Sequence, residues 1–126
     1  MSKATRIGIF VVVVCGLIGN LLALDGTGYL GFCKTYLRLQ ESPESATVGD
    51  GIDGGVCMGY LQGVTETARI WQQGKKFCLP EAAKNDQLIR VSIKYLEDNP
   101  AELHKPATFL LQMAFIDAFP CTEGEQ

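Results

Sequence analysis

The stretch "FCLPEAAKNDQLIRVSIKYLEDNP", from Phe77 to Pro100, combines a cysteine, a polar turn and a run with helical periodicity. Asn85 or Asp86 can cap this helix, because a side-chain oxygen there accepts from the free amides of the first turn. A further cysteine, Cys121, ends the motif "AFPC" later in the chain. Apolar spacing predicts one buried helix face. The residues expected on this buried face are Leu88, Ile89, Ser92, Ile93, Tyr95 and Leu96.

The N-terminus has the pattern of an export signal. Two basic residues precede an uncharged apolar run from Ile7 to Leu24, and this order is typical of secretory signals. We therefore assign residues 1–24 to a signal peptide, cleaved near Ala23 to Gly26, or to an uncleaved anchor. The second alternative stays open because the run is at the short limit of a membrane span. Residues 25–126 then form the exported domain, which we expect in the periplasm.

The charge balance limits the classes of partner. The chain carries a formal net charge of −3, and the two basic residues of the signal account for +2, so the exported domain carries −5. A nucleic-acid-binding protein would need clustered Lys and Arg to neutralise phosphates. We therefore expect no nucleic-acid partner, and membrane contact only through an uncleaved signal segment. The roughly one hundred remaining residues suffice for one small domain.

Four cysteines follow the signal segment: Cys33, Cys57, Cys78 and Cys121. An even number in a short exported chain is typical of a disulfide framework. A zinc site is the competing interpretation, but the intervals contain 23, 20 and 42 residues, and His104 is the single histidine. Zinc ligands occur at shorter spacings. We expect two disulfides, with no metal and no other cofactor.

Helical periodicity predicts four helices, over residues 29–40, 56–73, 87–98 and 107–119. The residues between the first two, 41–55, are rich in glycine, serine and acids, which predicts a loop. The last helix is apolar nearly all round, and such a helix is expected at the centre of a bundle. The predicted fold is all-α, a small disulfide-bonded bundle of four to five helices after the export signal.

Four cysteines permit three pairings, and sequence alone does not decide among them. The last two predicted helices are joined by the short link "NPAELHKP", and short links make antiparallel neighbours. Cys78 precedes the first of these helices and Cys121 follows the second, so the hairpin favours a bridge between them. Cys33 then pairs with Cys57 and ties the first helix to the second.

Four motifs in a fixed order carry a resemblance to a known family. Read together, "CMGYLQGV", "FCLP", "QLIRVSIKYLEDNP" and "AFPC" resemble the Rap/Tai family of small immunity proteins, the periplasmic inhibitors of type VI secretion amidase effectors. The resemblance covers roughly Tyr29 to Cys121. It implies an all-helical, often dimeric bundle. It also implies binding to a peptidoglycan amidase, whose active-site cleft the protein would block.

Five residues are candidates for partner binding. Glu44, Asp50 and Asp53 lie in the predicted loop, which either presents carboxylates to an effector or is a solvated linker. Trp71 stands near the polar end of its helix, where an exposed tryptophan would be an interface anchor. His104 has no nucleophile or second acid near it in the sequence, which favours a structural turn residue over a general base.

Gly55, Gly59 and Gly63 recur every fourth residue on the second predicted helix. Glycine in a helix interior costs about 1 kcal/mol relative to alanine, so the row predicts close approach by another helix. That neighbour is either the first helix of the same domain, which we favour, or a dimer mate.

The family resemblance implies a non-enzymatic periplasmic immunity protein. It would occlude the cleft of a type VI secretion amidase with its acidic loop or with the link between the last two helices. No catalytic residue is predicted, because bridged cysteines are not nucleophiles. The alternative is a general periplasmic binding or acid-stress chaperone-like protein with no amidase partner.

Overall fold

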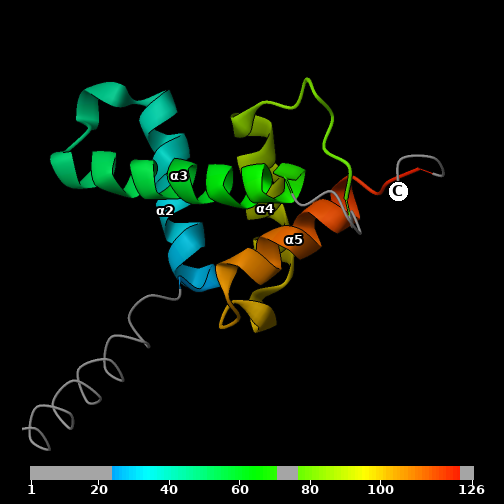
Figure 1. Ribbon diagram of the computed structural model, residues 1–126. Coiled ribbons are helices and arrows are strands. Elements are labelled where there is room, and N and C mark those ends of the chain that lie inside the picture. The colour runs from blue at the N-terminus through cyan, green and yellow to red at the C-terminus, as the bar shows by residue number, and fades with distance from the viewer. Residues whose placement is uncertain (1–23, 71–76, 123–126) are drawn as a thin grey trace, which may run out of the picture.

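The computed structural model describes residues 24–70 and 77–122, and within these ranges the chain forms helices and no β-strand. The elements are α2 (Gly26–Glu41), η1 (Pro43–Ser45), α3 (Val48–Ile70), α4 (Asn85–Asp98), η2 (Pro100–Glu102) and α5 (Ala107–Ala118), where η marks a single 3₁₀ turn (Figure 1). The predicted all-α, disulfide-bonded fold is confirmed. Nearly all of the predicted signal segment lies outside the described residues. No helix within the described ranges has the length and apolarity needed to span a bilayer.

Helices α2 and α3 cross and are joined by a buried disulfide. Cys33 on α2 and Cys57 on α3 are bonded, with their Cα atoms 5.0 Å apart, and both side chains are fully buried. Gly54 lies one turn earlier on α3, where a Cβ would be 3.2 Å from Leu39 Cδ1 of α2. The two helices therefore approach closely at the bridge. The predicted pairing of Cys33 with Cys57 is confirmed.

The second disulfide joins Cys78 to Cys121, with Cα atoms 4.9 Å apart. The backbone N–H of Cys78 also donates to Phe119 O at 2.9 Å. This predicted pairing is confirmed, although the end of α5 does not lie directly beside the start of α4. The chain from Cys78 to Lys84 covers the distance between them (Figure 1).

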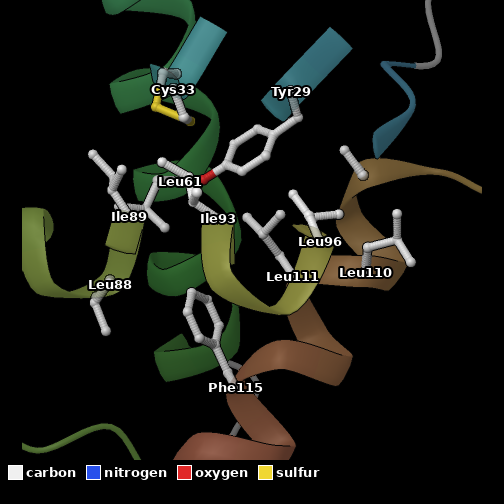
Figure 2. Close-up of a cluster of buried hydrophobic side chains, with 12 residues drawn as sticks. Tyr29, Cys33, Leu61, Leu88, Ile89, Ile93, Leu96, Leu110, Leu111 and Phe115 are labelled. Carbon is white, nitrogen blue, oxygen red and sulfur yellow. A yellow bond between two sulfur atoms is a disulfide. The ribbon is translucent and has the colours of Figure 1, made fainter. Parts of the chain in front are cut away.

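Side chains from all four α-helices meet in one core, where they point toward one another (Figure 2). Helix α4 contributes the face predicted from its periodicity, since all its predicted members are buried except Tyr95, which is half-buried. Helix α5 buries one face and exposes Thr108, Phe109 and Gln112, so the prediction that it is a central helix is wrong. A core of this size leaves the outer side of α5 uncovered.

One hydrogen-bonded pair crosses this apolar core. The Tyr29 hydroxyl lies 3.3 Å from Ser92 Oγ, and Ser92 Oγ donates to Ile89 O at 2.8 Å. Because the serine has one hydroxyl proton, Tyr29 is the donor in the longer bond. Burial raises the pKa of Tyr29 to about 12, so the phenol stays protonated as a donor. The pair satisfies both buried hydroxyls and aligns α2 with α4.

Two sequence-based boundaries are corrected by the structure. Helix α3 begins at Val48, so the prediction of a loop over residues 41–55 is wrong for its second half. Helix α4 begins at Asn85 with Lys84 in the N-cap position and no side-chain cap. Neither Asn85 nor Asp86 is the cap, because both are already inside the helix. The Asp86 carboxylate instead accepts a hydrogen bond from the Tyr36 hydroxyl at 2.9 Å, which ties α4 to α2.

Replacing Cys78 and Cys121 together by alanine is expected to lower the free energy of unfolding by about 4 kcal/mol. The bridge joins residues 43 apart in sequence. Without it, the unfolded chain regains the conformational entropy that the closed loop had removed. The matched variant, Cys33→Ala with Cys57→Ala, opens a 24-residue separation and also leaves a void in the core, so its loss should be at least as large. Urea unfolding measures both. A loss below about 1 kcal/mol for the first variant would contradict this account.

Candidate partner-binding surface

The connection between α2 and α3 forms a protruding corner, which we define as residues 41–52. Residues 43–49 are all exposed. In Figure 1 the corner lies at the left of the molecule, apart from α4 and α5. A convex element of this kind is suited to enter a cleft on another protein.

A capping box fixes the start of α3 within the corner. Thr47 Oγ1 and the Thr47 backbone N–H donate to Asp50 Oδ2 at 2.7 and 2.9 Å. In return, the Asp50 N–H donates to Thr47 Oγ1 at 3.2 Å. The pattern "TVGD" at residues 47–50 signals such a cap, and the loop prediction missed it. The reciprocal bonds allow a glycine-rich segment to begin a helix.

An ion pair ties the same carboxylate back to α2. Arg38 donates to Asp50 Oδ1 from the last turn of α2. Hydrogen bonds from Thr47, with the smaller effect of Arg38, lower the pKa of Asp50 from 3.8 to about 2. Asp50 is therefore ionised at neutral pH and engaged within the corner. Its role is to hold the corner in shape.

The outward side of the corner carries aliphatic side chains. Val48 is 85% exposed and Ile52 is 63% exposed, and they lie four residues apart on the first turns of α3. Glu44 is also exposed, and Asp53 is half-exposed. The corner thus presents two apolar side chains flanked by carboxylates. Isolated exposed apolar residues are ordinary, but two on one protruding turn indicate a contact surface.

The structure brings together three of the five predicted partner-binding residues. Glu44 and Asp50 lie in the corner and Asp53 follows it directly on α3, although Asp50 is satisfied internally. His104 is exposed in the turn after η2, near the start of α2. The 16 residues of α2 separate it from the corner by about 24 Å. Trp71 lies outside the described residues.

Sequence reasoning missed Val48 and Ile52 as candidate contact residues. Their spacing of four was visible in the sequence, but it acquires meaning only when residues 48–55 are helical. No group of three or more His, Cys, Asp or Glu side chains in the described part of the chain is placed to hold a metal ion.

The glycine row on α3 is exposed. A Cβ added at Gly55, Gly59 or Gly63 would have no atom within 4 Å, so the prediction that these glycines pack inside the domain is wrong. Gly54, one residue away from the row, faces α2 instead. Gly59 and Gly63 line an open groove of about 480 Å³ between α3 and α5. Thr108 and Gln112 form its other side.

The described residues form a small helical protein with two disulfides. Residues 25–121 match the family model described as Rap1a immunity proteins, and the chain belongs to this family. No curated protein and no solved structure matches the chain. Family membership supports a role as an immunity protein that binds a protein effector. The family match agrees with the resemblance to the Rap/Tai family that the four sequence motifs carry.

We expect the stability of the domain to fall as the pH is lowered from about 4 to about 2. The pKa of Asp50 is about 2 in the folded protein against 3.8 ordinarily, so the unfolded chain takes up a proton first. The contribution of Asp50 is complete above pH 4 and disappears as the pH passes below 2. Urea unfolding of wild type and Asp50→Asn across this range should show the steeper fall in the wild type.

Carbon-13 NMR of the Asp50 carboxyl group tests the cause directly. Thr47→Ala should raise the pKa of Asp50 more than Arg38→Ala does, because Thr47 provides the larger effect. Titration of wild-type Asp50 near its ordinary pKa of 3.8 would show that the capping box is not formed in solution.

Proposed function

We propose that this protein is a periplasmic immunity protein that binds a peptidoglycan amidase effector of a type VI secretion system and occludes its active-site cleft. The exposed aliphatic pair at the α2–α3 corner, Val48 and Ile52, is the observation that carries the proposal. Family membership favours this role over the acid-stress alternative. The protein would act by binding and would perform no catalysis itself.

The corner has the physical properties of an inserting element. The capping box and the Arg38–Asp50 ion pair hold its backbone before any partner binds. Preorganisation lowers the conformational entropy lost on association. Aliphatic groups at the centre of an interface gain free energy from desolvation, while surrounding carboxylates such as Glu44 steer the approach of a basic cleft rim.

The disulfides and the N-terminal segment support the periplasm as the compartment in this proposal. Two disulfides are expected to persist in an oxidising space such as the periplasm, and the basic and apolar N-terminal segment would direct export there. Peptidoglycan lies in that compartment, so an amidase and its inhibitor would meet on the substrate side of the inner membrane.

Ile52→Asp is expected to raise the concentration needed for half-inhibition of the amidase about 30-fold, which corresponds to about 2 kcal/mol lost by placing a charge in an apolar contact. The neighbouring genes are first searched for an NlpC/P60-like amidase, which is then purified as the partner. Hydrolysis of a peptidoglycan stem peptide is titrated with the immunity protein. Because Ile52 is 63% exposed, the variant should keep wild-type stability within about 0.5 kcal/mol.

Ile70→Asp is the matched control, since Ile70 lies on the same helix and is 77% exposed, but at the opposite end of α3. It should inhibit like the wild type. If both variants lose inhibition equally, the corner is not the contact site. If the wild-type protein leaves the amidase fully active, the amidase is not its partner.

We further propose that the protein forms a homodimer through the glycine row of α3. The domain leaves Gly55, Gly59 and Gly63 uncovered, although each glycine lowers the stability of the helix. A helix of a second copy can approach such a row more closely than it can approach larger side chains. The groove between α3 and α5 borders the glycine row and adds surface that a second copy could contact.

Gly59→Ala combined with Gly63→Ala should weaken the dimer and stabilise the monomer. Each alanine adds about 1 kcal/mol of helix propensity in open space, while the new methyl groups separate the two copies. Analytical ultracentrifugation and urea unfolding report the two effects. Gly31→Ala is the control, because Gly31 is also open but lies on α2. A monomeric wild-type protein would disprove the dimer.

A further inference from the structure

Most of the cationic side chains in the described ranges are used within the fold. Seven Lys and Arg residues lie there, and four of them form ion pairs: Lys34 with Glu97, Arg38 with Asp50, Lys94 with Asp98, and Lys105 with Glu102. The three others, Arg69, Lys84 and Arg90, have no ion pair among the described residues. Two of these three, Lys84 and Arg90, line one depression on the outer face of α4.

This α4 depression is an open hollow of about 520 Å³, lined by Lys84, Asp86, Gln87, Arg90, Val91 and Lys94. Its three cationic side chains are exposed, whereas Val91 is half-buried. The row from Lys84 to Lys94 extends about 15 Å along the helix. Cationic groups around an apolar side chain are suited to contact a carboxylate-bearing surface of another protein.

The fold leaves the Arg90 guanidinium free. Asp86 precedes Arg90 by four residues, which is the spacing and order at which a carboxylate pairs well with a base on a helix. The Asp86 carboxylate instead accepts from the Tyr36 hydroxyl at 2.9 Å, and Asp86 and Arg90, both in the described ranges, form no ion pair. Partial burial, and to a smaller extent Asp86, raise the pKa of Tyr36, so the phenol stays a donor. Tyr36 thus holds the competing carboxylate on the α2 side.

We propose that the α4 depression is a second contact for the protein effector, in which Arg90 and Lys84 bind an acidic side chain beside the amidase cleft. This inference rests on the proposed function, because the amidase is the partner in both. A guanidinium presents parallel N–H donors that match the two oxygens of a carboxylate, and a nearby ammonium adds a point charge. The group that is bound is therefore an Asp or Glu side chain of the effector.

The depression is close enough to the corner for one partner to cover both. The hydrogen bond from Tyr36 to Asp86 ties the start of α4 to α2. Tyr36 precedes the corner, which begins at residue 41, by about 8 Å along α2. In Figure 1 the end of α2 and the start of α4 both lie at the upper side of the molecule. A standard protein interface covers about 800 Å² on each partner, a patch about 30 Å across.

An anionic membrane fits the depression less well than a protein does. Recognition of acidic lipid head groups uses clusters of about four to eight Lys or Arg residues. The depression offers two cations that have no ion pair among the described residues. Asp86 lies in the same depression, and Glu97 and Asp98 follow on the same helix, so an extended anionic surface would be repelled. A single acidic side chain can approach Arg90 and avoid these carboxylates.

Arg90→Glu is expected to lower the association rate constant with the amidase about tenfold and to change the dissociation rate little, because exposed interface charges act mainly on association. The difference from the wild type should shrink at high salt, which screens exposed charges. Biolayer interferometry with the NlpC/P60-like amidase measures both rates. Arg69→Glu is the matched control, since Arg69 is the third unpaired cation of the described residues and lies in the last turn of α3. It should associate at the wild-type rate.

Two further variants test the positioning by Tyr36. Tyr36→Phe removes the hydrogen bond to Asp86, so this carboxylate can pair with Arg90 and compete with the effector. Association should slow about twofold, as expected for an exposed pair on one helix. Adding Asp86→Asn to Tyr36→Phe removes the competing charge and should restore the wild-type rate. A double variant as slow as Tyr36→Phe alone would show that Tyr36 acts only on the structure, which contradicts the inference.

Equal association rates for Arg90→Glu and Arg69→Glu would overturn the inference and leave the corner as the effector contact. A wild type that does not bind the amidase would remove the proposed function and this inference with it. If Arg90→Glu binds the amidase normally but abolishes binding to phosphatidylglycerol vesicles or self-association, the occupant is a membrane or a second copy, and the inference is wrong. Urea unfolding checks that each variant is folded.

Discussion

The buried bridge between Cys33 and Cys57 is the constraint on which the rest of the structure depends. It fixes the crossing of α2 and α3 at the level of the core, where Tyr29 and Leu61 are also fully buried. In a small domain the core is limited, so the covalent bond adds to packing in holding the two crossing helices. Once the crossing is fixed, the ends of the two helices extend beyond the core and meet in the protruding corner.

The corner combines a rigid backbone with an incompletely buried surface. Asp50 is used entirely for local order, because it accepts from Thr47, just before its own helix, and from Arg38 at the end of α2. Val48 and Ile52 are left outside, where their apolar surface stays in contact with water and can be buried by a partner. This division between residues that shape the corner and residues that remain free to contact a partner is the physical basis of the proposed inhibitory role in a Rap1a immunity protein.

The sequence predicted those features that depend on residues close together in the chain, and it failed for features that depend on packing between distant segments. The buried face of α4 could be predicted because its apolar residues recur with helical spacing within one short stretch of sequence. The order of the helices favoured both disulfide pairings, although a segment with a turn at residues 81–82 separates Cys78 from the start of α4. The prediction of a loop over residues 41–55 was wrong for its second half, because it relied on the glycine, serine and acid content and overlooked the capping pattern at Thr47 and Asp50. The glycine row was assigned to the interior, since its spacing gives no information about which side of a helix faces the core.

The sequence by itself determined the helical class and the family motifs and favoured one pairing of the cysteines, because these depend on periodicity, order and spacing along the chain, whereas the structure decided that pairing. Only the tertiary structure decided which surfaces remain open. Burial is a property of the whole arrangement, so the same glycine spacing places Gly54 against α2 and Gly55 in open space. For the same reason, the hydrogen bond from Tyr36 to Asp86 could not be inferred from the chain, because it joins segments that become neighbours only when the core has formed.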